Sequence, residues 1–201
     1  MGTWRHHSLR LVAVVLLAAV VAGCVTTVRP PATPVEPVEV YLLDHGRTPS
    51  LVLPAAGGGM TRYAYGDWSW YALGRKSSGS AVSALFRPTP AALGRQELGG
   101  PQEVGTVRAA VFVEIEAVHP FAVEREQAAA LAARLEELFR LRADTSTPNP
   151  ENGLDFVRHP EPYTLLHSSN RVTAAWLREL GCEVRGRALL SRWRVAPPSS
   201  R

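Results

Sequence analysis

The stretch VRAAVFVEIEAVHPFAVEREQAAALAARLEELFRL, residues 107–141, contains the two clearest structural patterns of the chain. Its first part, residues 107–117, places apolar side chains at every second position, which is typical of a half-buried β-strand. Its later part, residues 124–141, repeats apolar residues at three- and four-residue spacings, which predicts an amphipathic α-helix. A strand that precedes a long helix favours a fold in which helices pack on a sheet.

The residues before this stretch are rich in β-forming side chains. Gly57-Gly58-Gly59 predicts a hairpin connection, because the lysine and the strand-to-helix setting of a phosphate-binding loop are missing. Asp67 is expected to cap a short helical piece at 68–73, and residues 80–86 are expected to form another. Three strands are predicted here: 38–44, 51–54 and 61–65.

The residues after the long helix predict one more helix, at 169–180, with Ser168 or Ser169 as its cap and Gly181 at its end. Residues 144–162 contain four prolines and predict a long loop. A short strand is expected at 163–166, and a last one within 185–195. The elements together predict an α+β fold, a mostly antiparallel sheet with two packed helices, over residues 38–196, with 197–201 as a tail.

The N-terminal residues resemble a secretory signal of a particular kind. Residues 1–10 are basic, and residues 11–22 form an apolar run shorter than the ~20 residues that span a bilayer. Val21-Ala22-Gly23-Cys24 resembles the bacterial lipobox, which implies that residues 1–23 are removed and that Cys24 is acylated. A plain N-terminal membrane helix is the alternative, and Gly23 with the threonines that follow makes a poor span.

A lipid on Cys24 would attach the chain to a membrane, which is the partner that the sequence predicts. Residues 24–37 carry four prolines and are expected to form an extended, semi-rigid tether. Because Val25 rather than aspartate follows the cysteine, resemblance to known lipoproteins implies the outer membrane, with the domain facing the periplasm.

Charge argues against nucleic acid as a partner. The 201 residues carry a formal charge of +4, and Arg5 and Arg10 of the signal supply half of it. The remaining basic residues are scattered, whereas nucleic-acid-binding proteins concentrate them on one face. Cys182 has no partner if Cys24 is acylated, and a lone cysteine between a helix and a strand is expected to be a small buried apolar residue.

Two short segments resemble an uncharacterised family of bacterial lipoproteins whose fold is similar to a circularly permuted papain-like (NlpC-type) cysteine hydrolase. The first is LLDHGRTPSLVLP, residues 42–54, followed by YGDW, residues 65–68. The second is LHSSNRVTAAWL, residues 166–177. In that family a histidine precedes the first strand and a cysteine opens the late helix. The resemblance implies a groove formed by Thr48, Tyr65, Asp67, Trp68 and Asn170.

Both members of the family's catalytic dyad are absent at the matched positions. The histidine position falls on Thr48 and the cysteine position on Ser169. A serine at a helix N-terminus needs a true base, which threonine cannot supply. His45 or His167 could serve as that base, so a serine hydrolase or acyltransferase that uses Ser169 and His45 on an envelope amide or ester stays open. The favoured hypothesis is a non-catalytic binding or scaffolding module, with the serines as helix caps and His45 in a turn.

The remaining candidate residues predict no cofactor and no metal. The aromatic residues of 63–71 either pack in the core, which is favoured, or form a stacking platform for sugars of peptidoglycan or another envelope component. None of the six histidines has a metal-ligand spacing, and His119 is expected to be a loop residue at a strand end.

Overall fold

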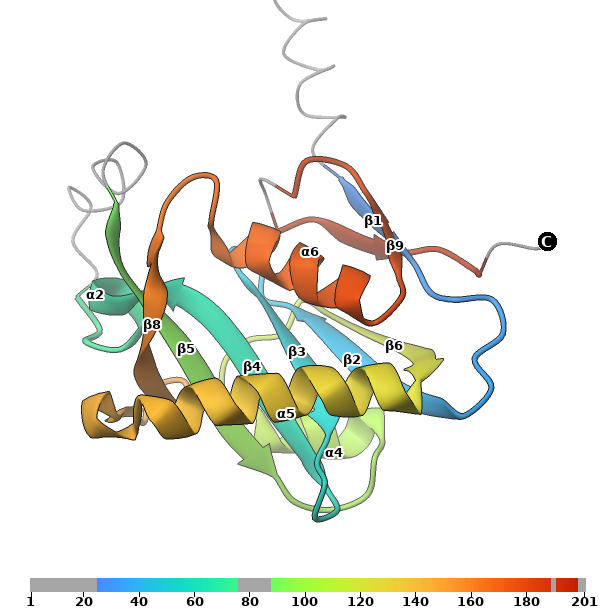
Figure 1. Ribbon diagram of the computed structural model, residues 1–201, viewed down its shortest axis with the longest axis horizontal. Helices are drawn as coiled ribbons and strands as arrows, with labels where there is room; N and C mark the ends of the chain where they lie inside the picture. Colours follow the sequence, from blue (N-terminus) through green and yellow to red (C-terminus); the bar gives the residue numbers. More distant parts are fainter. Residues whose placement is uncertain (1–24, 76–87, 189–190, 199–201) are drawn as a thin grey trace, which may run out of the picture.

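The computed structural model describes residues 25–75, 88–188 and 191–198. Their main feature is a seven-stranded antiparallel sheet with the strand order β6-β2-β3-β4-β5-β8-β7 (Figure 1). A smaller sheet has the order β10-β1-β9. The strands of the large sheet are β2 Pro37–Asp44, β3 Pro49–Pro54, β4 Met60–Asp67, β5 Thr89–Leu98, β6 Ala117–Glu124, β7 Thr147–Asn149 and β8 Leu154–Tyr163. Those of the small sheet are β1 Thr26–Arg29, β9 Glu183–Arg185 and β10 Trp193–Val195.

Helices cover both faces of the large sheet. On one face lie α5 (Arg125–Leu141) and α6 (Ser169–Glu179), and on the other lie α4 (Val104–Ala110) and the short α2 (Trp68–Tyr71) (Figure 1). A 3₁₀ turn, Ala143–Thr145, follows α5. None of the described helices is long and apolar enough to cross a bilayer. The fold is therefore α+β, with a central sheet between two layers.

The central strands are apolar on both faces because both faces are covered. In β4, Tyr63 and Tyr65 face α5 and α6, whereas Arg62 and Ala64 lie on the opposite face. The main core lies between the sheet and the two longer helices, and it includes Leu131 of α5. These observations confirm the expected strands 38–44, 51–54 and 61–65 and the helices 124–141 and 169–180.

The strand predicted at 107–117 is wrong. Residues 104–110 form α4, and the strand begins only at Ala117. Val104, Val107 and Val111 are spaced by three and four residues, so the apolar alternation also fits one face of a helix, and that face packs on the sheet. β6 is an edge strand, which explains why it tolerates Pro120. His119, expected in a loop, lies in β6 opposite Leu42.

The long loop predicted at 144–162 is also wrong. Its residues include β7 and most of β8, which extend the sheet beyond β5. Pro148 is tolerated because β7 is the other edge strand, and Pro160 and Pro162 lie where β8 has passed the end of β7. Of the strand expected at 163–166, only Tyr163 belongs to β8, and the rest forms a turn into α6.

The expected tether, 24–37, contains a strand of the folded domain. Thr26–Arg29 is β1, which pairs with β9 and β10, and Val28 is fully buried in the main core. The carboxylate of Asp44 in β2 accepts a hydrogen bond of 2.6 Å from the Ser191 hydroxyl and so joins the two sheets. The ordered structure therefore begins well before residue 38.

Several local expectations are confirmed. Asp67 caps α2 by accepting a 2.9 Å hydrogen bond from the backbone N–H of Trp70. Ser168 is the cap residue of α6, although its side chain makes no capping hydrogen bond, and Gly181 ends this helix with φ +77°. Cys182 is buried in the main core, and burial raises the pKa of its thiol to about 12. The helical piece expected at 80–86 lies outside the described residues.

Candidate functional site

A groove of about 590 Å³ lies along α6. One wall comes from α6 itself, a second from the end of β8 and the turn that follows it, and a third from residues 186–188 after β9. Polar and charged side chains line most of it: Arg134, His159, Glu161, His167, Arg171, Arg178, Glu179 and Arg187. The groove is the strongest candidate site in the described part of the chain.

Two residues that line this groove, His167 and Glu161, belong to a hydrogen-bonded chain of three side chains. The Tyr65 hydroxyl, from β4, lies 2.8 Å from Nδ1 of His167, and Nε2 of His167 lies 3.1 Å from the Glu161 carboxylate. The ring of Tyr65 also packs edge-on against His159, with 5.0 Å between centroids. The alternation of β4 directs Tyr65 toward α6, and the turn after β8 brings His167 back over it.

Burial shifts the pKa values of two side chains in and beside this hydrogen-bonded chain. Burial, aided by the nearby Glu161 carboxylate, raises the pKa of Tyr65, so its phenol stays protonated and donates its hydrogen bond. Burial lowers the pKa of His159, so its imidazole stays neutral near pH 7. His167 is positioned between the Tyr65 phenol and the Glu161 carboxylate.

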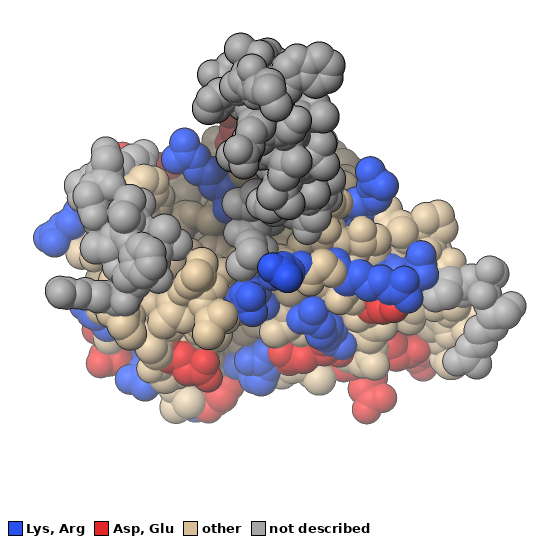
Figure 2. Space-filling view, turned by 90° about the horizontal axis from the view of Figure 1, so that it is seen from above, with Lys and Arg blue, Asp and Glu red and all other residues tan. Residues whose placement is uncertain are grey.

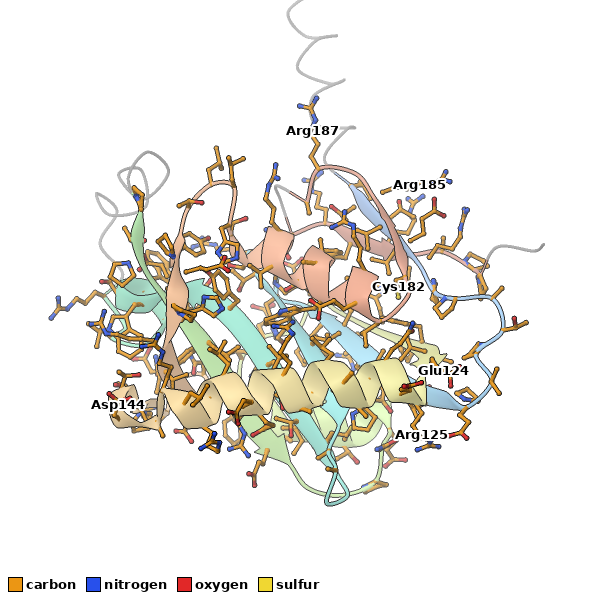
Figure 3. All side chains as sticks on the ribbon, in the orientation of Figure 1. Glu124, Arg125, Asp144, Cys182, Arg185 and Arg187 are labelled. Atoms are coloured by element: carbon orange, nitrogen blue, oxygen red, sulfur yellow. The ribbon has the colours of Figure 1, made fainter. Side chains whose placement is uncertain are left out.

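The arginines of the groove divide into two groups. Arg134 forms a bidentate ion pair with Glu179 across α5 and α6, at 2.9 Å. Arg171, Arg178 and Arg187 have no carboxylate partner among the described residues; Arg178 donates to the Val184 carbonyl instead. Nε of Arg171 is buried without a hydrogen-bond partner there. Basic side chains gather over the face seen in Figure 2, and Arg187 projects upward from that side of the molecule in Figure 3.

Ser169 is not arranged as a nucleophile. Its side chain is only 1% exposed, and its hydroxyl has no hydrogen-bond partner among the described residues, imidazoles included. The amide oxygen of Asn170 beside it is also buried and unpartnered within the described ranges. An activated serine needs a base within hydrogen-bond reach, so Ser169 lacks the contact that this chemistry requires.

His45 lies on the other side of the sheet from Ser169. Nδ1 of His45 donates to the Glu114 carbonyl at 2.8 Å, and Nε2 lies 2.9 Å from the Ser50 hydroxyl and 3.3 Å from the Arg62 guanidinium. Ser50 and Arg62 face α4, because the next residue of each strand faces α6. The structure therefore does not bring Ser169 and His45 together. Burial, with Arg62 nearby, lowers the pKa of His45 to about 4.

Arg62 shows that the His45 side of the sheet is a structural cluster. Its side chain is 2% exposed and donates to the Ser50 hydroxyl, the Gln96 amide oxygen and the Asn152 carbonyl. Burial lowers its pKa to about 10. The donors of the guanidinium are thus used within the fold, and none is directed at an open groove.

None of the residues expected to form the papain-like groove lines the observed one; Tyr65 only contacts two of its lining residues, His159 and His167. Asp67 is occupied by the α2 cap and by the Thr89 hydroxyl at 2.5 Å. Trp68 is buried under the Arg158 guanidinium, and Thr48 lies beside Tyr71 of α2. Tyr63 and Tyr65 belong to the main core, and Trp68 and Tyr71 pack α2 on the opposite face, so the favoured core interpretation of the aromatic residues is confirmed.

A second groove, of about 760 Å³, lies between α5 and the β3–β4 hairpin. Its α5 wall consists of alanines 128, 129, 132 and 133 together with Arg125 and Glu136. Both arginines that line it have carboxylate partners: Arg95 lies 2.8 Å from Glu136 and 2.5 Å from Glu97, and Arg125 lies 3.3 Å from Glu36. The larger groove therefore offers an anion no arginine without a carboxylate partner, and the smaller groove beside α6 is the better candidate.

The described residues contain no group of three or more His, Cys, Asp or Glu side chains that could hold a metal ion. The sequence did not single out His159, Arg171 or Arg187, because they come from three separate segments with no common spacing. The spacing of His159, Glu161 and His167 was the one local signal, and the prolines between them obscured it. No family model matches the chain, and no curated protein or solved structure matches it significantly.

Proposed function

We propose that this chain is a bacterial envelope lipoprotein, anchored through a lipid on Cys24, whose domain binds an anionic group without catalysing a reaction. The observation that carries the binding proposal is the set of three groove arginines without a carboxylate partner among the described residues. Guanidinium groups bind carboxylates and phosphates through paired, charge-assisted hydrogen bonds. Envelope polymers, peptidoglycan among them, and envelope lipids offer anionic groups of these two kinds.

The geometry of Ser169 supports a non-catalytic module over a serine hydrolase. Its hydroxyl is buried without a described hydrogen-bond partner, and His45 is hydrogen-bonded on the far side of the sheet. His167, the nearer imidazole in sequence, is bonded to Tyr65 and Glu161. We therefore propose no reaction for this site.

The finer fold proposal is a permuted papain-like domain with a degenerate dyad. Its support is the packing of α6 over β3 and β4, so that the helix matched to the family's cysteine lies on the strand matched to the family's histidine. The Thr48 and Ser169 side chains themselves are engaged differently. Thr48 lies beside Tyr71 of α2, and Ser169, the first residue of α6, is buried.

Lipidation is tested by replacing Cys24. The Cys24→Ser precursor should take up no radiolabelled palmitate, because the acyl acceptor is the cysteine thiol. The Cys182→Ser precursor is the matched control and should label normally. Palmitate incorporation into the Cys24→Ser protein would overturn the proposed anchor, and fractionation of the labelled protein on a sucrose gradient would test the outer-membrane placement.

Anion binding is tested with inorganic phosphate on the mature chain at low ionic strength. A ligand that binds only the folded state adds about 1.4 kcal/mol of stability at ten times its Kd. For a domain of this size that raises Tm by roughly 3–6 °C. The increase should be lost in Arg171→Gln/Arg187→Gln and kept in Arg108→Gln, a control on the exposed face of α4. An equal increase in all three proteins would contradict a specific site.

The absence of catalysis is tested with an active-site probe. A fluorophosphonate should leave the mature chain unlabelled, because Ser169 lacks a base and is buried. Stoichiometric labelling that disappears in Ser169→Ala would overturn the non-catalytic proposal and establish a serine nucleophile.

A further inference from the structure

The folded domain leaves almost no spacer before the proposed lipid anchor. The backbone N–H of Thr26 donates to the Arg192 carbonyl at 2.8 Å, which fixes the first residue of β1. Gly186 packs closely against Val25, the residue before Thr26. A Cβ added to Gly186 would lie 2.8 Å from the Val25 carbonyl oxygen. Val25 is therefore held against the small sheet. Cys24 is covalently next to it, with adjacent Cα atoms only ~3.8 Å apart.

An exposed apolar turn lies on the same side of the molecule. Leu165 and Leu166, between β8 and α6, are 46% and 73% exposed. Leu166 lines the α6 groove, and so do Gly186 and Arg187 on its opposite wall. Because Gly186 also contacts Val25, the chain exit, the groove and the apolar turn form one continuous surface, which we call the anchor face.

The anchor face carries an excess of positive charge. Its acidic side chains are already paired: Glu161 with His167, Glu179 with Arg134, and Glu183 with Arg29 and Arg185. Three further arginines, at 171, 178 and 187, remain without a carboxylate among the described residues. The view of this side in Figure 2 shows basic atoms across the middle of the surface and acidic atoms mainly along its lower edge.

We propose that the anchor face docks on the surface of an anionic bilayer, with the groove arginines on phospholipid phosphates and Leu165 and Leu166 inserted at the interface. The inference rests on the proposed lipidation of Cys24 and names the anionic ligand of the groove as the lipid headgroup. Apolar insertion combined with basic side chains is the usual basis of interfacial membrane binding. A short anchor also gives the face a high effective concentration at the bilayer.

The docked state predicts a specific environment for Leu166. A nitroxide on Leu166→Cys can be introduced selectively, because Cys24 is acylated and Cys182 is buried with a raised thiol pKa. Leu141→Cys is the matched control, since Leu141 is also an exposed apolar residue (61%) but lies at the far end of α5 (Figure 1). The lipidated protein would be reconstituted into vesicles of phosphatidylglycerol with phosphatidylethanolamine, and into vesicles of phosphatidylcholine alone.

In phosphatidylglycerol vesicles the nitroxide at 166 should gain accessibility to oxygen and lose accessibility to a water-soluble nickel chelate. The nitroxide at 141 should show neither change. Each arginine neutralised in Arg171→Gln and Arg187→Gln should lower the ratio of docked to undocked protein about fivefold, the equivalent of about 1 kcal/mol. High salt, or vesicles of phosphatidylcholine alone, should also lower the ratio of docked to undocked protein.

Flotation of the vesicles separates this inference from the proposed anchor. If the protein floats with the vesicles while position 166 remains as accessible to the nickel chelate as position 141, the anchor stands and membrane docking is wrong. If the protein does not float, the proposed lipid anchor has failed. Equal docking on neutral and anionic vesicles would contradict the role of the arginines.

Discussion

Replacing Ser169 with alanine should stabilise the protein, which is the opposite of the usual effect of a substitution in a core. The Ser169 hydroxyl is 1% exposed and has no described hydrogen-bond partner. A buried hydroxyl without a hydrogen bond costs about 1–3 kcal/mol in protein mutational data. Removing one oxygen leaves a small void that offsets part of this gain. We expect the free energy of unfolding to rise by about 1 kcal/mol, and Tm by roughly 2–4 °C.

Two neighbours provide controls for this expectation. Thr173 is fully buried and its hydroxyl is also unpartnered within the described residues, so the isosteric Thr173→Val should stabilise at least as much, because it leaves no void. Ser168 is half-buried at the helix cap and makes no capping hydrogen bond, so Ser168→Ala should stay within about 0.5 kcal/mol of the parent. Urea unfolding measures all three variants.

A loss of stability of more than about 1 kcal/mol in Ser169→Ala would refute the reasoning. Such a loss would mean that the hydroxyl is hydrogen-bonded in the folded protein, as a serine paired with a catalytic base would be. The size of the effect in Thr173→Val would then show whether the discrepancy is confined to Ser169 or applies to all of α6.

Three further predictions follow from the rest of the fold. The pKa of His45 is lowered from its ordinary 6.5 to about 4, so the unfolded chain binds a proton at His45 more readily than the folded chain does. The free energy of unfolding should therefore fall as pH drops from 6.5 to 4. Thermal unfolding measured across that pH range should show a weaker dependence of stability on pH in His45→Gln. A smaller dependence of the same sign should remain, because the pKa values of His119 and His159 are also lowered. The Cys182 thiol should react with an aromatic disulfide only after unfolding by guanidinium, and stoichiometric reaction of the native mature chain would disprove its burial. Gly94→Ala should cost about 1–3 kcal/mol, because its Cβ would lie 2.6 Å from the Phe156 ring, whereas Gly99→Ala, in open space, should cost less than half as much in the same urea experiment.

Much of the fold is predictable from the sequence because most of its elements have local signals. The apolar runs of β2, β3 and β4, the amphipathic period of α5 and α6, and the Asp67 cap each depend on residues close together in the chain. The failures occurred where two patterns coincide. The valines of residues 104–111 fit both a helical and an alternating period, and only packing against the sheet decides between them.

Proline explains the other errors. The prolines of residues 144–162 predict a loop when the neighbouring strands are unknown, yet edge positions tolerate them, so β7 and β8 could not be recognised locally. β1 could not be recognised locally either, because it pairs with β9 and β10, whose residues lie more than 150 positions away. The groove also depends on long-range placement. Nothing in the sequence distinguishes Arg171 and Arg187 from other surface arginines. They become candidate site residues only because α6 and the turn after β9 bring them to one groove.

The most direct test of the proposed function is an NMR titration of the mature chain, labelled with ¹⁵N-arginine, with inorganic phosphate at low ionic strength. We predict saturable shifts of the side-chain Nε–H signals of Arg171 and Arg187, with little change at Arg108 on α4 or at Arg62, whose donors are engaged within the fold. Shifts that are absent, or that are linear and equal for all exposed arginines, would contradict an anion-binding groove beside α6.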